Sequence, residues 1–367
     1  MATTIKRIGI LTGGGDCPGL NAAIRGLGKA ALFKGIEVVG IQDGYQGLIE
    51  NRTVELGLDE LSGILTRGGT ILGTNNKCSP EKYHEGNDQT GKPIYSNAVD
   101  RCMANAQEHE LDVLFVIGGD GTFTCTKPLV EAGLPCIGVP KTIDNDIYGT
   151  DLTIGFTTAT RIGTMALDRL HSTGDSHHRV MVCELMGRNS GWLTLASGLA
   201  SGSDVILIPE IPFDMDTICK FVDSRRNGRS GFSIIACAEG AHQVDGQQVI
   251  AKHIDSSPDP IRLGGIGQYV SYEIESRTGI ETRTTTLGHI QRGGEPAATD
   301  RVVATTFATA AFEFAMDGKF NTMVSLSNGH IEAKDILDAA GKQRLIPKDH
   351  RFIRAAKAVK TCFGDSS

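Results

Sequence analysis

The sequence predicts a parallel α/β fold. Short runs of apolar, β-branched residues alternate with helical patterns along all 367 residues, and several of these runs end in glycine-rich turns. Residues 111–117 are as apolar as strands that are buried on both faces of a parallel sheet. The length is enough for two domains or one large one, and no repeat of solenoid length is visible.

The composition narrows the class of protein. A net charge of −7 argues against nucleic acid as a partner, and the 40% hydrophobic content supports a core. Nine scattered cysteines without a Cys-x-x-Cys pair indicate reduced thiols, and neither zinc nor a disulfide framework. No segment approaches the ~18 apolar residues of a membrane span. We therefore expect a soluble, cytoplasmic protein that binds no membrane.

The first strand is predicted at residues 7–12, and it runs into Gly13, Gly14 and Gly15 before a helix at residues 21–33. A strand, a glycine turn and a helix together direct backbone N–H groups toward phosphate. The spacing is neither that of the dinucleotide fingerprint nor that of a Walker loop. A tight turn would explain one or two glycines, whereas three in a row favour close approach of a ligand.

A second phosphate-type turn follows later. The strand at residues 111–117 delivers Gly118–Thr122, in which glycines allow close approach, Asp120 suits Mg²⁺, and Thr122 can donate to a phosphoryl oxygen. Between the two turns lie a strand at 37–41, a glycine-rich turn at 67–77 that carries a lysine, and a polar surface loop at 79–97.

The chemistry is expected where the strand at residues 134–139 ends. Lys141, Asp144 and Asp146 follow it, at the end of a strand where α/β proteins collect ligands. One carboxylate can take a proton from a hydroxyl while the other holds a cation, and the lysine can stabilise a transferring group. The alternative is that Asp144 and Asn145 only shape a turn.

The second half continues the alternation of strands and helices, with a polar loop inserted at 240–266. Strands are predicted at 179–185, 205–210, 232–239 and 281–287, and helices at 156–172, 267–277 and 299–316, the last followed by Gly318. Cationic side chains gather here: Arg179, Arg188, Arg283 and Arg292, with His177, His178 and His289. Arg188, Arg283 and Arg292 follow or end predicted strands, and arginine suits phosphate. The residues together predict a phosphoryl transferase with an anionic acceptor.

Six motifs resemble the 6-phosphofructokinase family, in its order and spacing, from about residue 7 to about residue 320. They are Leu11–Asp16, Pro18–Arg25, Gly118–Thr122, Thr142–Asp146, Met186–Arg188 and Gly288–Gly294. The resemblance implies two Rossmann-like parallel-sheet domains with the active site in the cleft between them. It assigns residues 1–154 and about 291–341 to a nucleotide-binding domain, and 155–290 and about 342–367 to a sugar-phosphate-binding domain.

The resemblance also implies the roles of single residues. Donor binding falls to Gly15, Asn76, Lys77, Gly119, Asp120, Gly121 and Thr122, with Asp120 serving Mg²⁺. Asp144 becomes the base for the sugar 1-hydroxyl, with Asp146, Lys141 and Arg188 as further catalytic residues. Fructose 6-phosphate is bound by Thr142, Ile143, Asp144, Arg179, Met186, Gly187, Arg188, Glu239, Arg283, His289 and Arg292. In the family, Arg179 and Arg283 reach across a subunit contact, which implies a homodimer or a homotetramer.

The chain departs from the best-known bacterial branch of the family at its donor site. Asn76-Lys77 replaces an Arg-Phe pair, and Lys141 replaces a glycine and matches the pyrophosphate-using branch. Gly121 points the other way, because that branch has an aspartate there, which fills the space of the α-phosphate. We therefore expect a glycolytic enzyme of the mixed subgroup that uses ATP. Pyrophosphate as donor, another acceptor, and a non-catalytic subunit are the alternatives.

The third departure concerns regulation. The positions that bind an effector in the bacterial allosteric enzymes are His171, Asp204 and residues 230–232, and only Arg25 keeps its charge. We expect no effector control of that kind.

Overall fold

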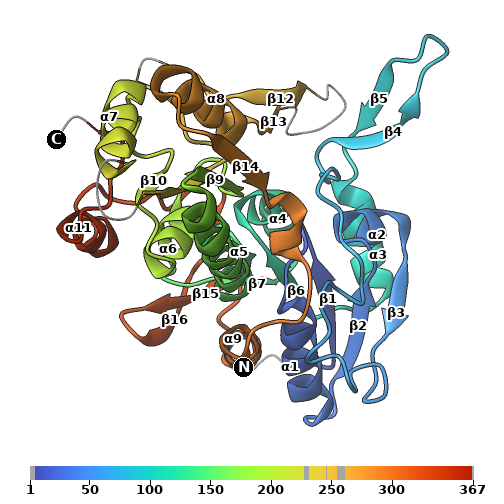
Figure 1. Ribbon diagram of the computed structural model, residues 1–367. Coiled ribbons are helices and arrows are strands. Elements are labelled where there is room, and N and C mark those ends of the chain that lie inside the picture. Colours follow the sequence, from blue (N-terminus) through green and yellow to red (C-terminus); the bar gives the residue numbers. More distant parts are fainter. Residues whose placement is uncertain (1–4, 227–230, 245, 254–260, 366–367) are drawn as a thin grey trace. The chain divides into compact units, whose positions relative to one another are not determined.

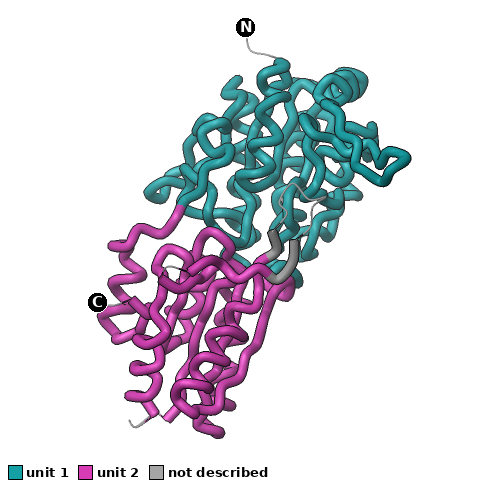
Figure 2. The backbone as a smooth tube through the Cα atoms, turned by 90° about the horizontal axis from the view of Figure 1, so that it is seen from above, with its two compact units in different colours: residues 1–157, 292–344 teal, residues 158–291, 345–367 magenta. Residues whose placement is uncertain are grey.

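The structure is a computed structural model, and it describes residues 5–226, 231–244, 246–253 and 261–365 (Figure 1). The chain forms two compact units, Met1–Thr157 with Arg292–Arg344 and Thr158–Gln291 with Leu345–Ser367 (Figure 2). The chain therefore passes from one unit to the other three times.

The first unit is built on an eight-stranded sheet in the order β16-β15-β7-β6-β1-β2-β3, with β8 beside β7. The central pairs are parallel, and only the edge pairs β2–β3 and β15–β16 are antiparallel. The strands are β1 (Arg7–Thr12), β2 (Glu37–Ile41), β3 (Thr53–Glu55), β6 (Val113–Gly118), β7 (Cys136–Thr142), β8 (Ile154–Gly155), β15 (Thr322–Ser327) and β16 (His330–Asp335). Every residue of β6 is buried, as expected for a strand covered on both faces.

Six helices belong to this unit. They are α1 (Leu20–Leu32), α2 (Tyr45–Glu50), α3 (Val99–Glu108), α4 (Asp120–Glu131), α9 (Ala298–Met316) and α10 (Ile336–Ala339). Helix α1 packs on α9, and Gly26 allows the close approach, because a Cβ there would lie 3.1 Å from Cβ of Ala308. The polar segment at 79–97 is not only loop: β4 (Tyr83–Asn87) and β5 (Pro93–Ser96) form a hairpin that projects beyond the large sheet (Figure 1).

The second unit contains a parallel sheet in the order β10-β11-β9-β14. Its elements are α5 (Phe156–His177), β9 (Val180–Leu185), α6 (Trp192–Ala200), β10 (Val205–Leu207), α7 (Met215–Arg226), β11 (Ser233–Ala238), α8 (Ile266–Thr278), β14 (Thr282–Thr286), the 3-10 helix η1 (Gly288–Arg292) and α11 (Arg351–Ala358). A core of Val182, Ile235, Phe213 and Val270 joins the sheet to its helices. The prediction of a parallel α/β fold is confirmed.

Several details differ from the sequence prediction. Strand β7 continues through Pro140 and Lys141 to Thr142, so Lys141 lies in the sheet and not in a loop. Asp120, Gly121 and Thr122 form the first turn of α4, where a loop was expected. The expected loop at 240–266 contains the pair β12 (Ile250–His253) and β13 (Ile261–Leu263), with residues 245 and 254–260 outside the described residues.

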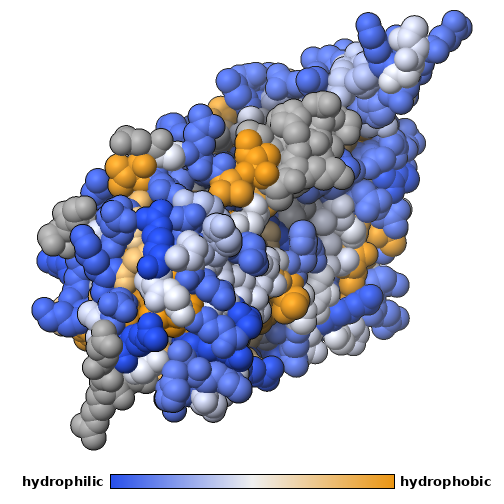
Figure 3. Space-filling model, turned by 45° about the horizontal axis from the view of Figure 1, so that its top comes forward, coloured by the Kyte–Doolittle hydropathy of each residue, from blue (hydrophilic) through white to orange (hydrophobic). Residues whose placement is uncertain are grey.

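The surface in Figure 3 is mostly hydrophilic, with small separate apolar patches. Within the described part of the chain, none of the helices combines the length and hydropathy needed to cross a bilayer.

Candidate active site

Two glycine turns meet at the carboxyl ends of the neighbouring strands β1 and β6. Gly13 donates a backbone hydrogen bond to the carbonyl oxygen of Ile117, with 3.0 Å between the two atoms. A Cβ at Gly13 would lie 2.5 Å from Cγ2 of Thr122, and a Cβ at Gly118 would lie 2.4 Å from Cβ of Thr122. Only glycine fits at both positions, because the two turns pack on the same threonine.

The second turn is the start of a helix. Gly119 caps α4 in an extended conformation, and Asp120 is its first residue. The first N–H groups of a helix have no partner within the helix, and together with the helix dipole they favour an anion. At Gly121 an added Cβ would meet nothing within 4 Å. The space in front of this helix end is therefore open at the position where the sequence lacks a side chain.

Two cations border the first glycine turn. Nζ of the buried Lys141 donates to the carbonyl oxygen of Gly15 across 2.6 Å, and Nη1 of Arg292 donates to that of Asp16 across 3.1 Å. A Cβ at Gly15 would lie 2.7 Å from Nη1 of Arg292. Burial lowers the pKa of Lys141 from its ordinary value. Both side chains place positive charge next to the loop that the sequence assigns to phosphate.

Asp144 lies in the turn that follows β7, and its backbone N–H donates to Oγ1 of Thr142 across 3.2 Å. Its Oδ1 is buried and has no hydrogen-bond partner among the described residues. Such an atom is costly unless a ligand satisfies it. The next residue, Asn145, adopts a left-handed conformation with φ 53°, so Asp144 and Asp146 are separated by a sharp turn.

The carboxylates of this region influence one another. Burial raises the pKa of Asp144, Arg292 and Lys141 lower it, and Asp120 raises it. Burial, followed by the charges of Asp144 and Asp120, raises the pKa of Asp146 to about 8. Strand register explains the proximity, because Gly118 of β6 pairs with Pro140 of β7. The structure thus brings Asp144 and Asp146 close to the start of α4.

The carboxylates of Asp120, Asp144 and Asp146 suit a cation that binds together with a phosphate ligand. Among the described residues, no group of three His, Cys, Asp or Glu side chains is arranged to hold a metal by itself. Mg²⁺ usually takes only one or two carboxylates and completes its shell with phosphates and water. Asp120, with the unpartnered Oδ1 of Asp144 nearby, meets that need.

Asn76 and Lys77 are exposed. The two residues before them, Thr74 and Asn75, were not among the predicted site residues. Gly14 donates its N–H to the carbonyl oxygen of Asn75 across 3.3 Å, and Oγ1 of Thr74 donates to that of Gly14 across 2.7 Å. Thr74 and Asn75 therefore hold the first glycine turn. The sequence signal that could have identified them is their polar character next to a glycine-rich turn.

In the second unit, five sequence-predicted residues lie at the carboxyl end of the parallel sheet. Met186–Arg188 follows β9, Glu239 follows β11 and His289 lies in η1 after β14. Gly240 comes so close that a Cβ would lie 1.8 Å from the carbonyl oxygen of Arg188. The buried Gln291 accepts from the N–H of Met186 across 2.8 Å, which joins η1 to the same end of the sheet.

Arg179 and Arg283 lie at the other end of that sheet. Arg179 precedes β9, and Arg283 is the second residue of β14, so the prediction that Arg283 follows or ends a strand was wrong. Both guanidinium groups pair with Glu281, at 2.8 Å for Arg179. At ~3.3 Å per residue, the six residues of β9 separate Arg179 by about 20 Å from the carboxyl end of the sheet. A ligand at the carboxyl end is out of reach of these two arginines in the same unit.

Three of the positions that the resemblance assigns to an effector contact other residues of the second unit, and a fourth, Ser230, lies outside the described residues. Oδ1 of Asp204 pairs with Nη2 of Arg225 at 2.6 Å, and its Oδ2 accepts from the N–H of Ile234 across 2.9 Å. The ring of His171 packs edge-on against Phe232.

The site belongs to a class of protein, the α/β phosphotransferases. At the end of a parallel sheet it combines a helix start lined by glycine, a buried lysine and close carboxylates. A sequence model described as phosphofructokinase matches residues 7–315. The chain belongs to the phosphofructokinase family.

Curated relatives match the whole chain. An ATP-dependent 6-phosphofructokinase 2 of Clostridium perfringens is 45% identical over 367 residues and is covered over 100% of both chains. An ATP-dependent 6-phosphofructokinase of Spirochaeta thermophila is 46% identical over 361 residues, or 98% of each chain. The predicted family is confirmed.

Solved structures share the fold. The T-state phosphofructokinase of Pichia pastoris aligns with a TM-score of 0.76 and 30% identity over 92% of this chain, which spans only 35% of that longer chain. A pyrophosphate-dependent phosphofructokinase of Marinobacter aquaeolei aligns with a TM-score of 0.78 over 95% of this chain and 88% of its own. At 21% identity, the second likeness concerns the fold alone.

Proposed function

We propose that the protein transfers the γ-phosphoryl group of ATP to the 1-hydroxyl of fructose 6-phosphate in glycolysis. The products are fructose 1,6-bisphosphate and ADP. The observation that carries the proposal is the buried, unpartnered Oδ1 of Asp144, close to Asp120 at the start of α4. A base, a phosphate-binding helix end and two cations are what phosphoryl transfer needs.

We propose a role for each residue that is compatible with its position. Asp144 takes the proton of the 1-hydroxyl as that oxygen forms its bond to phosphorus, and the bond to the ADP oxygen breaks. Lys141 and Arg292 lower the pKa of Asp144 against the larger effect of burial, which raises it, and they stabilise charge on the transferring group. Gly15, Asn76, Lys77 and Gly119–Thr122 line the donor site. Mg²⁺, held through Asp120, neutralises phosphate charge when bound, and Asp146 supports that side.

The acceptor falls to the second unit together with the turn of Asp144. Arg188, Glu239 and His289, with the backbone at Met186 and Gly187, bind fructose 6-phosphate, and Thr142 and Ile143 of the first unit help to orient it. An arginine suits the 6-phosphate because its planar fork engages two oxygens at once. Assignment of the nucleotide to the first unit and of the sugar phosphate to the second rests on these residues.

ATP is the donor that both the relatives and Gly121 favour. An aspartate at position 121 would project into the open space before α4, where the α-phosphate of ATP carries the same charge. Gly121 leaves that space free. Lys141 serves either donor and does not discriminate between them.

Arg179 and Arg283 are proposed to complete the acceptor site of a neighbouring subunit. Their position at the amino end of the sheet, away from Arg188, supports action in another copy of the chain. The active form is then a homodimer or homotetramer, which we place in the cytoplasm.

An assay that offers each donor in turn tests the proposal. Purified protein with fructose 6-phosphate and Mg²⁺ should form fructose 1,6-bisphosphate with ATP and none with pyrophosphate. Turnover with pyrophosphate alone would refute the donor, and no turnover with either would refute the activity.

A further inference from the structure

The turn that carries Asp144 and Asp146 is contacted by a short segment that is distant in sequence, residues 343–346. Gln343 forms an antiparallel bridge with Ile147, and the N–H of Arg344 donates to the carbonyl oxygen of Asp146 across 2.7 Å. The segment therefore runs alongside the turn just after its second carboxylate.

The side chain of Arg344 binds the middle of the same turn. Its Nη2 and Nε donate to the carbonyl oxygen of Asn145 across 2.8 and 3.3 Å. That carbonyl lies between Asp144 and Asp146 in the chain. Two donors of a planar guanidinium on one acceptor fix direction as well as distance.

The turn needs such support. Asn145 adopts a left-handed backbone, which residues other than glycine rarely occupy. Its side chain donates to the carbonyl oxygen of Asp151 across 3.2 Å, and Thr153 donates to the carbonyl oxygen of Thr142 across 2.6 Å. These two bonds join the turn to residues 151–153 that follow it, whereas Arg344 binds the backbone carbonyl of Asn145 at its centre.

The end of the segment lies in the second unit, where Glu210 contacts both it and the loop that follows β9. Within the second unit, the N–H of Ile346 donates to Oε1 of the carboxylate of Glu210 across 3.1 Å. Both oxygens of Glu210 also accept from the N–H of Gly191, at 3.1 Å each. Gly191 lies three residues after Arg188, so one carboxylate joins the segment to the loop of Arg188.

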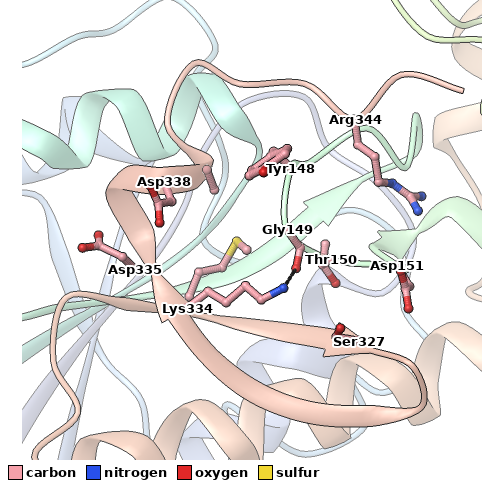
Figure 4. A pocket seen from close by; sticks show the side chains of 11 residues that line it. Tyr148, Gly149, Thr150, Asp151, Ser327, Lys334, Asp335, Asp338 and Arg344 are labelled. Carbon is pink, nitrogen blue, oxygen red and sulfur yellow. Dashed lines mark hydrogen bonds between the residues drawn. The ribbon is translucent and has the colours of Figure 1, made fainter. Parts of the chain in front are cut away.

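Arg344 is also reachable from solvent. It lines a cavity of about 410 Å³ in the first unit, together with Tyr148, Gly149, Asp151 and Lys334. Figure 4 shows Arg344 and Asp151 at one end of the cavity and Asp335 and Asp338 at the other. A small cation can therefore enter the space that the side chain of Arg344 leaves when it is shortened.

We propose that Arg344 is a positioning residue that sets the direction of Asp144. The inference rests on the proposed function, since it assumes that Asp144 is the base. Arg344 acts through the backbone at Asn145 and touches no reacting atom. A base that is displaced by about 1 Å loses roughly 100-fold in rate, so a positioning residue is visible in kcat.

The test compares Arg344→Ala and Arg344→Lys with the wild-type enzyme. Arg344→Ala should lower kcat by about 10- to 100-fold and leave the KM for ATP within about twofold. Arg344→Lys, which keeps one donor, should retain an intermediate kcat. Tens of millimolar guanidinium chloride, far below the molar concentrations that unfold proteins, should restore part of the kcat of Arg344→Ala and none for wild type.

Lys342→Ala is the matched control. Lys342 is an exposed cation near the same cavity that pairs with Asp338 at 3.5 Å and lies 5.5 Å from the centre of the ring of Tyr148. It should leave kcat and the guanidinium response as in wild type. An unchanged kcat in Arg344→Ala would overturn the inference, and so would a loss that neither guanidinium nor lysine restores.

Hydrogen exchange gives a readout that does not depend on turnover. Peptides that cover residues 143–152 should exchange faster in Arg344→Ala than in wild type or in Lys342→Ala. Equal exchange in all three proteins would refute the positioning role even if the wild-type protein proved inactive, whereas an inactive wild type with the expected exchange pattern would refute only the proposed function.

Discussion

Lys141 and Gly15 are joined by a hydrogen bond of 2.6 Å, from the ammonium group of a residue in β7 to a carbonyl oxygen of the turn after β1. The bond fixes a buried cation beside the site proposed for the γ-phosphate. Because this lysine lies inside the sheet, its position is set by strand pairing and not by a mobile loop.

Replacement of Lys141 by methionine should therefore lower kcat by about 10²- to 10³-fold, the cost of losing one preorganised donor to developing charge. The fold should survive, because methionine fills similar volume and removes a buried charge whose solvation is lost on folding. Steady-state kinetics and the melting temperature check this. A rate within a few-fold of wild type would assign the charge stabilisation to Arg292 instead.

Asp144→Asn should reduce kcat by about 10²- to 10⁴-fold with little change in the KM for fructose 6-phosphate, because the amide cannot accept a proton. Asp88→Asn, in the exposed hairpin, is a suitable control for loss of one carboxylate. If Asp144→Asn keeps more than a tenth of the wild-type rate, another group is the base.

Gly121→Asp should abolish turnover with ATP without harming the fold. The new side chain enters open space, and a carboxylate in the first turn of α4 is favourable to the helix dipole. Gly121→Asn has nearly the same shape without the charge and separates steric from electrostatic effects. Sustained ATP turnover in Gly121→Asp would show that this position does not select the donor.

The stability of the ligand-free protein should depend on Asp146. Its pKa in the folded state is about 8, above its ordinary value of about 4, so its stabilising contribution is present at low pH and is lost as pH rises through 8. Asp146→Asn should therefore gain in melting temperature relative to wild type between pH 5 and pH 8, by a few degrees at pH 8. Thermal unfolding without Mg²⁺ or nucleotide measures the difference, and a gap that does not change with pH contradicts the raised pKa.

If Arg283 acts in the site of a neighbouring subunit, two inactive variants should complement each other in a mixed oligomer. Arg283→Ala and Asp144→Asn should each be nearly inactive, whereas subunits mixed by mild dissociation and reassociation should regain part of the activity. A mixture of Arg188→Ala and Asp144→Asn should regain none, since each proposed site takes both residues from one chain. Equal behaviour of the two mixtures would place Arg283 in the site of its own chain.

The sequence predicted the strands that are buried on both faces, because continuous apolar runs such as residues 113–118 have no other stable location. It missed the start of α4, because Gly119, Gly121 and Pro128 are poor helix formers that tertiary packing overrides. The exposed edge strands β3 and β16 carry no comparable apolar run.

Within the candidate site, the residues in short motifs were predicted. The residues that hydrogen-bond to the loops of these motifs were not. Asp144 and Asp120 lie in motifs with a chemical reason, and the structure brings them together. Arg344 and Glu210 are distant in sequence from the loops that they hold, and no local pattern marks them. Arg283 lies near the start of its strand in both the prediction and the structure, and the sheet register shows that this start is at the amino end, away from Arg188.

The chain passes three times between its units, and this order of assembly has a consequence for synthesis on the ribosome. Strand β7 pairs with β15, so this flank of β7 stays open until β15, which ends at Ser327, has left the exit tunnel. An unpaired parallel strand is a site for wrong association. This edge of the sheet therefore stays unpaired on the ribosome while residues 158–291 of the second unit are synthesised.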